Sequence, residues 1–246
     1  MKYLRSYKQF ESKETYHQLF DVNMIHLWKV ADKIYAVSCT DDNVKNMLFC
    51  RFQEHYESPE FKQKKFKMSD YIKWYKKDND KFTYTDDWSG FNLPSETIED
   101  CLSGIEDEND WDIMMRSIIE TIKSEESGKF YLLGVEEMVM DGEDVLDHEI
   151  SHGMFYTDPQ YRSEIVELIH QMDPKDREMM TKIILDYGYD ESVVDDEIGA
   201  YLTTGLASKM KNQGLEKYFN IFGLVFNKFK NQHVKGGPKE IKINWI

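Results

Sequence analysis

Two histidines and a glutamate lie within five consecutive residues of the chain, in the sequence HEISH at residues 148–152. On an α-helix, residues four apart lie one turn apart on the same face, so both imidazoles can bind one metal ion. Glu149 stands beside the first imidazole, where its carboxylate can take a proton from an activated water without binding the metal. The spacing therefore predicts one zinc ion per chain, with His148 and His152 as ligands and Glu149 as general base.

A third protein ligand is needed to complete such a site. Glu197 is the favoured candidate, because it follows His152 by 45 residues and lies on a separate segment with a helical apolar pattern. Asp158, six residues after His152, is the alternative. A chain that turned back to bring Asp158 to the metal would need a glycine near position 155, which is Phe155 here, and an aspartate before Pro159 is a typical helix N-cap. The remaining candidates are four nearby acids, Asp186, Glu191, Asp195 and Asp196.

Two tyrosines stand four residues after a proposed ligand, Tyr156 after His152 and Tyr201 after Glu197. Each can lie one helical turn from the metal, where a phenol could donate a hydrogen bond to a developing oxyanion. The chain has 15 tyrosines, and ordinary burial or half-burial in the core is the favoured explanation for each of these two.

The elements that position these residues can be predicted from local patterns. A short apolar strand at 130–135 precedes a helix that begins near residue 143 or 144 and ends near 156. The most regular helix pattern runs from Trp111 to Ile122, with Asp110 as its N-cap. Two Asp-Pro pairs, 158–159 and 173–174, each begin a further helix, and Gly188 ends the second.

Weaker signals surround these elements. Helices are expected at 193–211 and 215–230, with residues 236–238 ending regular structure, and short strands at 34–37 and 82–85. Residues 88–94 read as a turn that could face a substrate. Lysines alternate with aromatic residues from 61 to 77, which in so acidic a chain favours a solvated helix face with buried aromatic side chains over nucleic-acid binding.

These elements together predict an α+β fold in one domain, 1–246, with a small mixed sheet and a helical C-terminal half. Within this domain we expect a strand-rich N-terminal region plus a helix at 1–125, a catalytic core at 126–235 and a C-terminal tail at 236–246.

The residues from about 130 to 207 resemble the zincin metallopeptidases, in the gluzincin arrangement of HExxH followed by a glutamate on a later helix. The resemblance implies zinc ligation by His148, His152 and Glu197, with Glu149 as general base. It also implies that an extended substrate pairs with an edge strand formed by Phe130, Tyr131, Leu132 and Leu133. The sequence departs from the thermolysin-like pattern, which has an aspartate where this chain has Tyr201 and a further histidine for the oxyanion.

Composition limits the classes of function. The chain has 246 residues, a formal net charge of −15 and 41% hydrophobic residues, too apolar for a disordered chain and too acidic for a general nucleic-acid binder. Its apolar runs are shorter than a membrane span needs, and its first residues lack the apolar stretch of a secretory signal. Three cysteines, Cys39, Cys50 and Cys101, form no CxxC pair and indicate a reducing compartment, so we expect a cytoplasmic protein.

The sequence thus predicts a zinc-dependent metallopeptidase that cleaves peptide bonds of specific intracellular proteins, with protein or peptide substrates and no membrane partner. The alternative is a zincin-fold binding module that keeps the metal and grips a protein partner without turnover.

Overall fold

The computed structural model describes residues 22–77, 81–88, 90–136, 143–187, 189–205, 210–211 and 213–246. Within them, one mixed sheet has the strand order β3-β4-β2-β1-β5. The strands are β1 (Ile25–Ala31), β2 (Ile34–Cys39), β3 (Phe91–Pro94), β4 (Tyr131–Glu136) and β5 (Lys239–Ile241). Strands β2 and β4 are parallel, and the other neighbours are antiparallel. Segments from the beginning, middle and end of the described chain therefore share one sheet.

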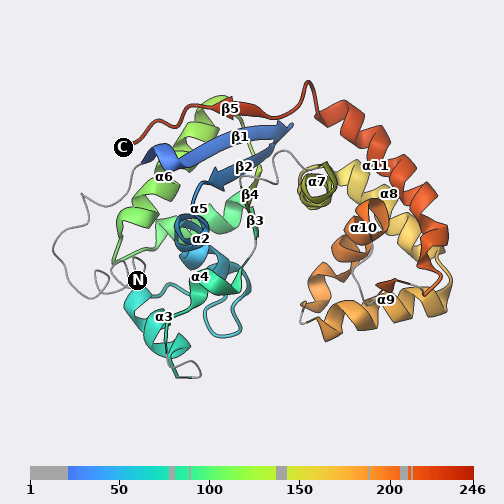
Figure 1. The fold of residues 1–246 in the computed structure, drawn as a ribbon, viewed down its shortest axis with the longest axis horizontal. Helices are drawn as coiled ribbons and strands as arrows, with labels where there is room; N and C mark the ends of the chain where they lie inside the picture. The colour runs from blue at the N-terminus through green and yellow to red at the C-terminus, as the bar shows by residue number, and fades with distance from the viewer. Residues whose placement is uncertain are drawn as a thin grey trace.

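Helices cover both faces of this sheet (Figure 1). On the first face lie α2 (Asp42–Glu57), α3 (Met68–Tyr75), α4 (Tyr84–Asp87), α5 (Ser95–Ser103) and α6 (Asp110–Glu125). The strand residues that point to this side include Tyr35 and Val37, while their neighbours Ile34 and Ala36 point to the other side. This alternation is the ordinary period of two along a strand, and it gives the molecule a separate apolar core on each face.

The second face carries α7 (Glu143–Thr157), which Figure 1 shows end-on between the sheet and the remaining helices. Those helices are α8 (Pro159–Gln171), α9 (Pro174–Asp186), α10 (Val194–Thr204) and α11 (Phe219–His233). Short 3-10 turns occur elsewhere along the described chain, at Val22–Met24, Glu191–Val193 and Leu215–Tyr218. Among the described helices, none has the length and apolarity to cross a membrane.

Local capping motifs explain the helices that the sequence predicted. The helix expected around 111–122 is α6, which begins with a capping box between Asn109 and Asp112 rather than with Asp110 as its N-cap. Asp158 and Asp173 cap α8 and α9 as expected, each with proline in the first turn. The proposed stop at Gly188 lies outside the described residues.

Several expectations for individual segments were wrong. The described part of 1–125 is mostly helical rather than strand-rich, and residues 82–85 lead into α4 instead of forming a strand. The segment 236–246 contains β5, which pairs with β1 and adds an edge to the sheet. Helix α10 ends at Thr204 and not at 211, because Gly205 adopts a φ of 142°, which an α-helix cannot continue.

The proposed substrate edge strand was also wrong. The proposed edge consists of the residue before β4 and the first three residues of β4, and all four are buried: Phe130, Tyr131, Leu132 and Leu133. Strand β4 pairs with β2 on one side and with β3 on the other, so its backbone groups are already used within the sheet. The edge nearest to α7 is β3, which lies in the segment 88–94 that the sequence suggested was a turn.

Candidate metal centre

Two glycines allow the helices that carry the HEISH sequence and Glu197 to pack closely against their neighbours. A Cβ at Gly153 of α7 would lie 2.7 Å from Ile34 Cδ1 of β2. A Cβ at Gly199 of α10 would lie 2.7 Å from Ile165 Cγ2 of α8. A Cβ at either position would require the helix or the isoleucine side chain to shift, so glycine allows this close approach of α7 to β2 and of α10 to α8.

The structure brings together the three residues predicted as metal ligands. His148 Nε2 lies 3.3 Å from His152 Nε2, and His152 Nε2 lies 3.8 Å from Glu197 Oε1. One ligand atom from each residue falls within 4.8 Å of the others. Atoms bound about 2.0–2.1 Å from a tetrahedral zinc ion lie about 3.3 Å from one another, so this spacing suits a small divalent cation.

Hydrogen bonding sets the tautomer of His148. The Thr204 hydroxyl donates to the Ala200 carbonyl oxygen at 2.9 Å, which leaves its oxygen to accept from His148 Nδ1 at 3.0 Å. With the ring proton on Nδ1, the lone pair of Nε2 is directed toward His152 and Glu197. Thr204 thereby presents His148 for metal binding through Nε2.

His152 is oriented in the same way by a carboxylate. Its Nδ1 lies 3.0 Å from Asp196 Oδ1, an ion-pair contact whose alignment falls short of a hydrogen bond, since Oδ1 has no hydrogen-bond partner among the described residues. A negative charge at this distance favours a hydrogen on Nδ1. Asp196 is the residue before Glu197, so α10 supplies both a candidate ligand and the group that orients another ligand. A carboxylate behind a metal-binding histidine is a common arrangement in zinc sites.

Glu149 is held next to this cluster by the edge strand β3. Its carboxylate is hydrogen-bonded to Asn92, and the Tyr131 hydroxyl donates to Asn92 Oδ1 at 2.9 Å. The Tyr131 contact fixes the amide so that its nitrogen faces Glu149. Oxygen Oε2 of Glu149 and Oε2 of Glu197 are buried and have no hydrogen-bond partner among the described residues. Buried carboxylate oxygens without partners are costly, and a bound cation and water would satisfy them.

The electrostatics of the cluster favour a cation. Burial raises the pKa of Glu197 to about 7 and also raises the pKa of Glu149. Burial lowers the pKa of His148 to about 3, helped by its neighbour His152. Burial acts on His152 in the same direction, but Asp196, Glu197 and Glu149 outweigh it and raise the pKa of His152 to about 10. A proton on His152 thus occupies the place that a divalent ion could take among these carboxylates.

The other candidate ligands lie elsewhere. Asp158 caps α8 by accepting from the backbone N–H groups of Gln160 and Tyr161, and it pairs with His233 Nε2 at 2.8 Å. Asp186 and Glu191 are exposed, and Asp195 is not part of the cluster of ligand atoms found among the described residues.

The two tyrosines differ in their relation to the cluster. The Tyr201 ring lies 5.0 Å from the His148 ring between centroids, and its hydroxyl is hydrogen-bonded to Tyr189. The Tyr156 ring instead packs 5.3 Å from Tyr131, and its buried hydroxyl has no hydrogen-bond partner among the described residues.

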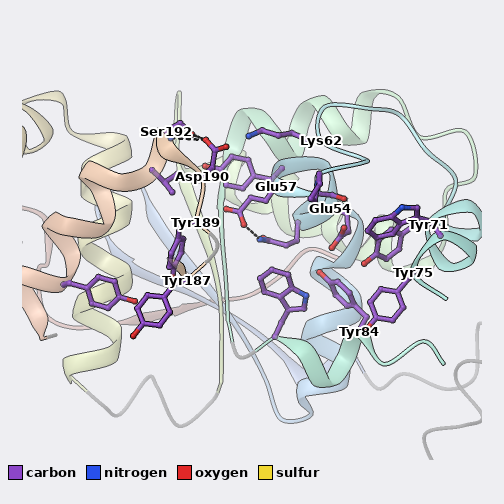
Figure 2. A pocket seen from close by; sticks show the side chains of 18 residues that line it. Glu54, Glu57, Lys62, Tyr71, Tyr75, Tyr84, Tyr187, Tyr189, Asp190 and Ser192 are labelled. Carbon is purple, nitrogen blue, oxygen red and sulfur yellow. Dashed lines mark hydrogen bonds between the residues drawn. The ribbon is translucent and has the colours of Figure 1, made fainter. Parts of the chain in front are cut away.

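Figure 2 shows the side chains that line a cleft with a volume of about 1160 Å³. Tyr201 belongs to this lining, and its contact with the His148 ring joins the cleft to the cluster. One wall is formed by the end of α2 with α3 and α4, and the other by Tyr187 and residues 189–193, which precede α10. The cleft is therefore large enough for several residues of a peptide.

Comparisons of this chain with protein-family models, with curated proteins and with solved structures find no match. The site consequently has to be interpreted from its own geometry. Sequence reasoning missed the roles of Asn92 and Thr204, and it weighed Asp196 only as a ligand. The position of Asp196 directly before Glu197 was a usable signal, whereas Asn92 reaches the site only through strand pairing.

Proposed function

We propose that the chain is a zinc-dependent metallopeptidase of the gluzincin type. The observation that carries the proposal is the convergence of His148 Nε2, His152 Nε2 and Glu197 Oε1 within 4.8 Å, with Glu149 beside them. Two imidazoles and one carboxylate form the ligand set of several zinc hydrolases, and they leave a fourth position open for water or substrate. The buried, unpartnered oxygen of Glu197 supports metal binding at this place.

Zinc, when bound, supplies a Lewis acid that polarises a peptide carbonyl and makes a water molecule more acidic. The chain's own residues have separate tasks. His148 and His152 hold the ion through Nε2, and Thr204 and Asp196 keep their rings in the required tautomer.

Glu149 is the proposed general base and acid. It takes a proton from the attacking water and delivers it to the leaving amine, and burial raises its pKa toward the range in which both transfers are efficient. Asn92 keeps the carboxylate aimed, and Tyr201 is the better placed of the two tyrosines to donate to the oxyanion. An extended peptide could pair with the free side of β3, the edge strand that contains Asn92.

The first test is metal content together with digestion of a diverse peptide library. We expect about one zinc per chain by elemental analysis and cleavage that a chelator abolishes. Glu149→Gln is expected to retain zinc and fold while losing on the order of 100-fold or more in rate. Glu167→Gln, an exposed position on α8, is the matched control and should leave both unchanged.

Two results would contradict this proposal. Purified protein that takes up no zinc at neutral pH would remove the metal site. A Glu149→Gln variant with full activity would show that another group moves the proton.

A further inference from the structure

The cleft beside the metal centre combines aromatic walls with acidic groups. Half of the eighteen lining residues are tyrosine or tryptophan, contributed by both walls. The acidic members are Glu54, Glu57 and Asp190, and the only lysine or arginine in the lining is Lys62. The lining therefore carries three carboxylates and one ammonium group, a surplus of negative charge on an aromatic surface.

Two of these carboxylates lack a cationic partner. Among the described residues, neither Glu57 nor Asp190 forms a salt bridge, whereas the acids Glu60, Asp70 and Glu164 each pair with a lysine. Glu57 Oε2 accepts a hydrogen bond from Gln53 Nε2 at 2.8 Å, and Asp190 Oδ1 accepts from the Ser192 backbone N–H at 3.0 Å. In the view of Figure 2, Glu57 lies between Asp190 and Tyr189 of one wall and Glu54 of its own.

We propose that this cleft is a subsite for a cationic side chain, arginine or lysine, of a peptide. The carboxylates of Glu57 and Asp190 pair with the charge, and the aromatic walls cover the aliphatic stem and contribute cation–π attraction. That the peptide is also a substrate rests on the proposed metallopeptidase function.

Other classes of ligand fit less well. An anionic side chain would meet three carboxylates with one lysine to offset them. A neutral apolar side chain would fill the aromatic cleft but would desolvate Glu57 and Asp190 without supplying a cationic partner. Lys62 is exposed and forms no salt bridge to either carboxylate among the described residues. Burial raises the pKa of Glu57 against the opposing charge of Lys62, whereas hydrogen bonds from Ser192, helped by Lys62, lower the pKa of Asp190.

Tyr201 connects this subsite to the metal centre. It lines the cleft, and its ring centroid is 5.0 Å from that of His148. A cationic residue in the cleft would therefore be only a few residues from a scissile bond at the metal.

Binding can be tested separately from cleavage. Isothermal titration of the full chain in chelator, where turnover is absent, compares Ac-Gly-Gly-Arg-Gly-Gly-NH2 with its citrulline twin, which is neutral and nearly isosteric. We expect the arginine peptide to bind at least tenfold more tightly, an advantage that shrinks with added salt. Glu57→Gln and Asp190→Asn should each reduce the ratio severalfold. Glu60→Gln, an exposed acid three residues from Glu57 and paired with Lys64, should not.

Equal affinity for the two peptides would overturn the proposal, as would a ratio that Glu57→Gln and Asp190→Asn both leave unchanged in variants that melt like wild type. Cleavage of both peptides by the zinc-loaded chain is then measured separately. Arginine-selective binding without cleavage would contradict the peptidase function and support the subsite. Cleavage without arginine selectivity would support the peptidase function and contradict the subsite.

Discussion

Two clusters of buried charge in this molecule are built in opposite ways. Arg51 of α2 is 3% exposed and makes five hydrogen bonds, to both carboxylate oxygens of Asp112, to the Asp107 carboxylate and to the backbone oxygens of Phe66 and Asp107. A guanidinium has five N–H donors, so each finds an acceptor. In the metal centre, by contrast, oxygens of Glu149 and Glu197 are buried without partners.

The difference shows how to tell a structural cluster from a binding site. A buried charge that holds a fold together is complete in the protein alone, because every unsatisfied group would weaken the native state. A cluster that is incomplete in the protein alone lowers stability, and its retention is explained when a ligand completes it. The following predictions test this contrast, from the largest expected effect to the smallest.

Removing the centre of the complete cluster should damage the fold most. Arg51→Met leaves Asp112 buried without its partner, and we expect the free energy of unfolding to fall by about 3–5 kcal/mol. Urea denaturation followed by circular dichroism measures it. Arg116→Met, which removes a partly exposed pair with Glu108, is the control and should change stability by less than about 1 kcal/mol. Equal losses of unfolding free energy in the two variants would show that the Arg51 cluster contributes no more to the fold than a partly exposed ion pair.

Removing a member of the incomplete cluster should do the opposite. We expect Glu197→Gln to weaken zinc binding by about 100-fold or more, because an amide is a poor substitute for a carboxylate ligand. In chelator, the same variant should lose little stability, because the cost of burying Glu197, which raises its pKa to about 7, offsets its attraction to His152. Competition with a zinc chelator gives the affinity and thermal melting gives the stability. A large loss of stability without metal would show that Glu197 is structural.

The residues that contact the proposed histidine ligands should have intermediate effects on zinc affinity. Asp196→Asn replaces the carboxylate charge beside His152 Nδ1 with a neutral amide, and Thr204→Val removes the oxygen that accepts from His148 Nδ1. We expect zinc affinity to fall by about 10- to 100-fold in each. Asp195→Asn is the control, since that carboxylate is outside the cluster of ligand atoms. If the control weakens zinc binding as much as Asp196→Asn does, the assigned orientation of His152 is incorrect.

The smallest effect should come from the rejected ligand candidate. Asp158→Ala removes the N-cap of α8, which should lower stability by about 1 kcal/mol and leave zinc affinity unchanged. Burial opposes ionisation of Asp158, but hydrogen bonds from Tyr161, His233 and Gln160 outweigh it and lower its pKa. The stabilisation is therefore present above the ordinary carboxyl pKa of about 4 and is lost as pH falls below it. A zinc affinity that drops with this substitution would reopen the choice of third ligand.

The sequence predicted what local patterns encode. The HEISH helix, the Asp-Pro caps of α8 and α9 and the choice of Glu197 over Asp158 as a cluster member all follow from spacing within a few residues or from capping chemistry. Helix α2 escaped prediction because it is buried on nearly all sides, with polar residues such as Lys45 and Gln53 inside, so no amphipathic period marks it.

Pairing between distant strands was beyond local patterns. The position of β4 inside the sheet depends on β3, and the edge strand β5 comes from the last residues of the chain. Asn92 reaches Glu149 only because β3 pairs with β4, a partnership between residues about 40 positions apart. The error about the substrate edge and the failure to identify Asn92 therefore have one cause, the pairing of β3 with β4.

The distance along the chain between His152 and Glu197 has a consequence for folding. Their 45-residue separation contains the whole of α8 and α9, which lead away from α7, and the chain returns to α7 at α10. A metal ion held at both ends would close this segment into a loop and reduce the conformational entropy of the unfolded chain, by about 4 kcal/mol if it acted as a permanent cross-link. A bound ion would thus link the unfolding of α8 and α9 to metal release, so that loading with metal protects a region remote from the chemistry.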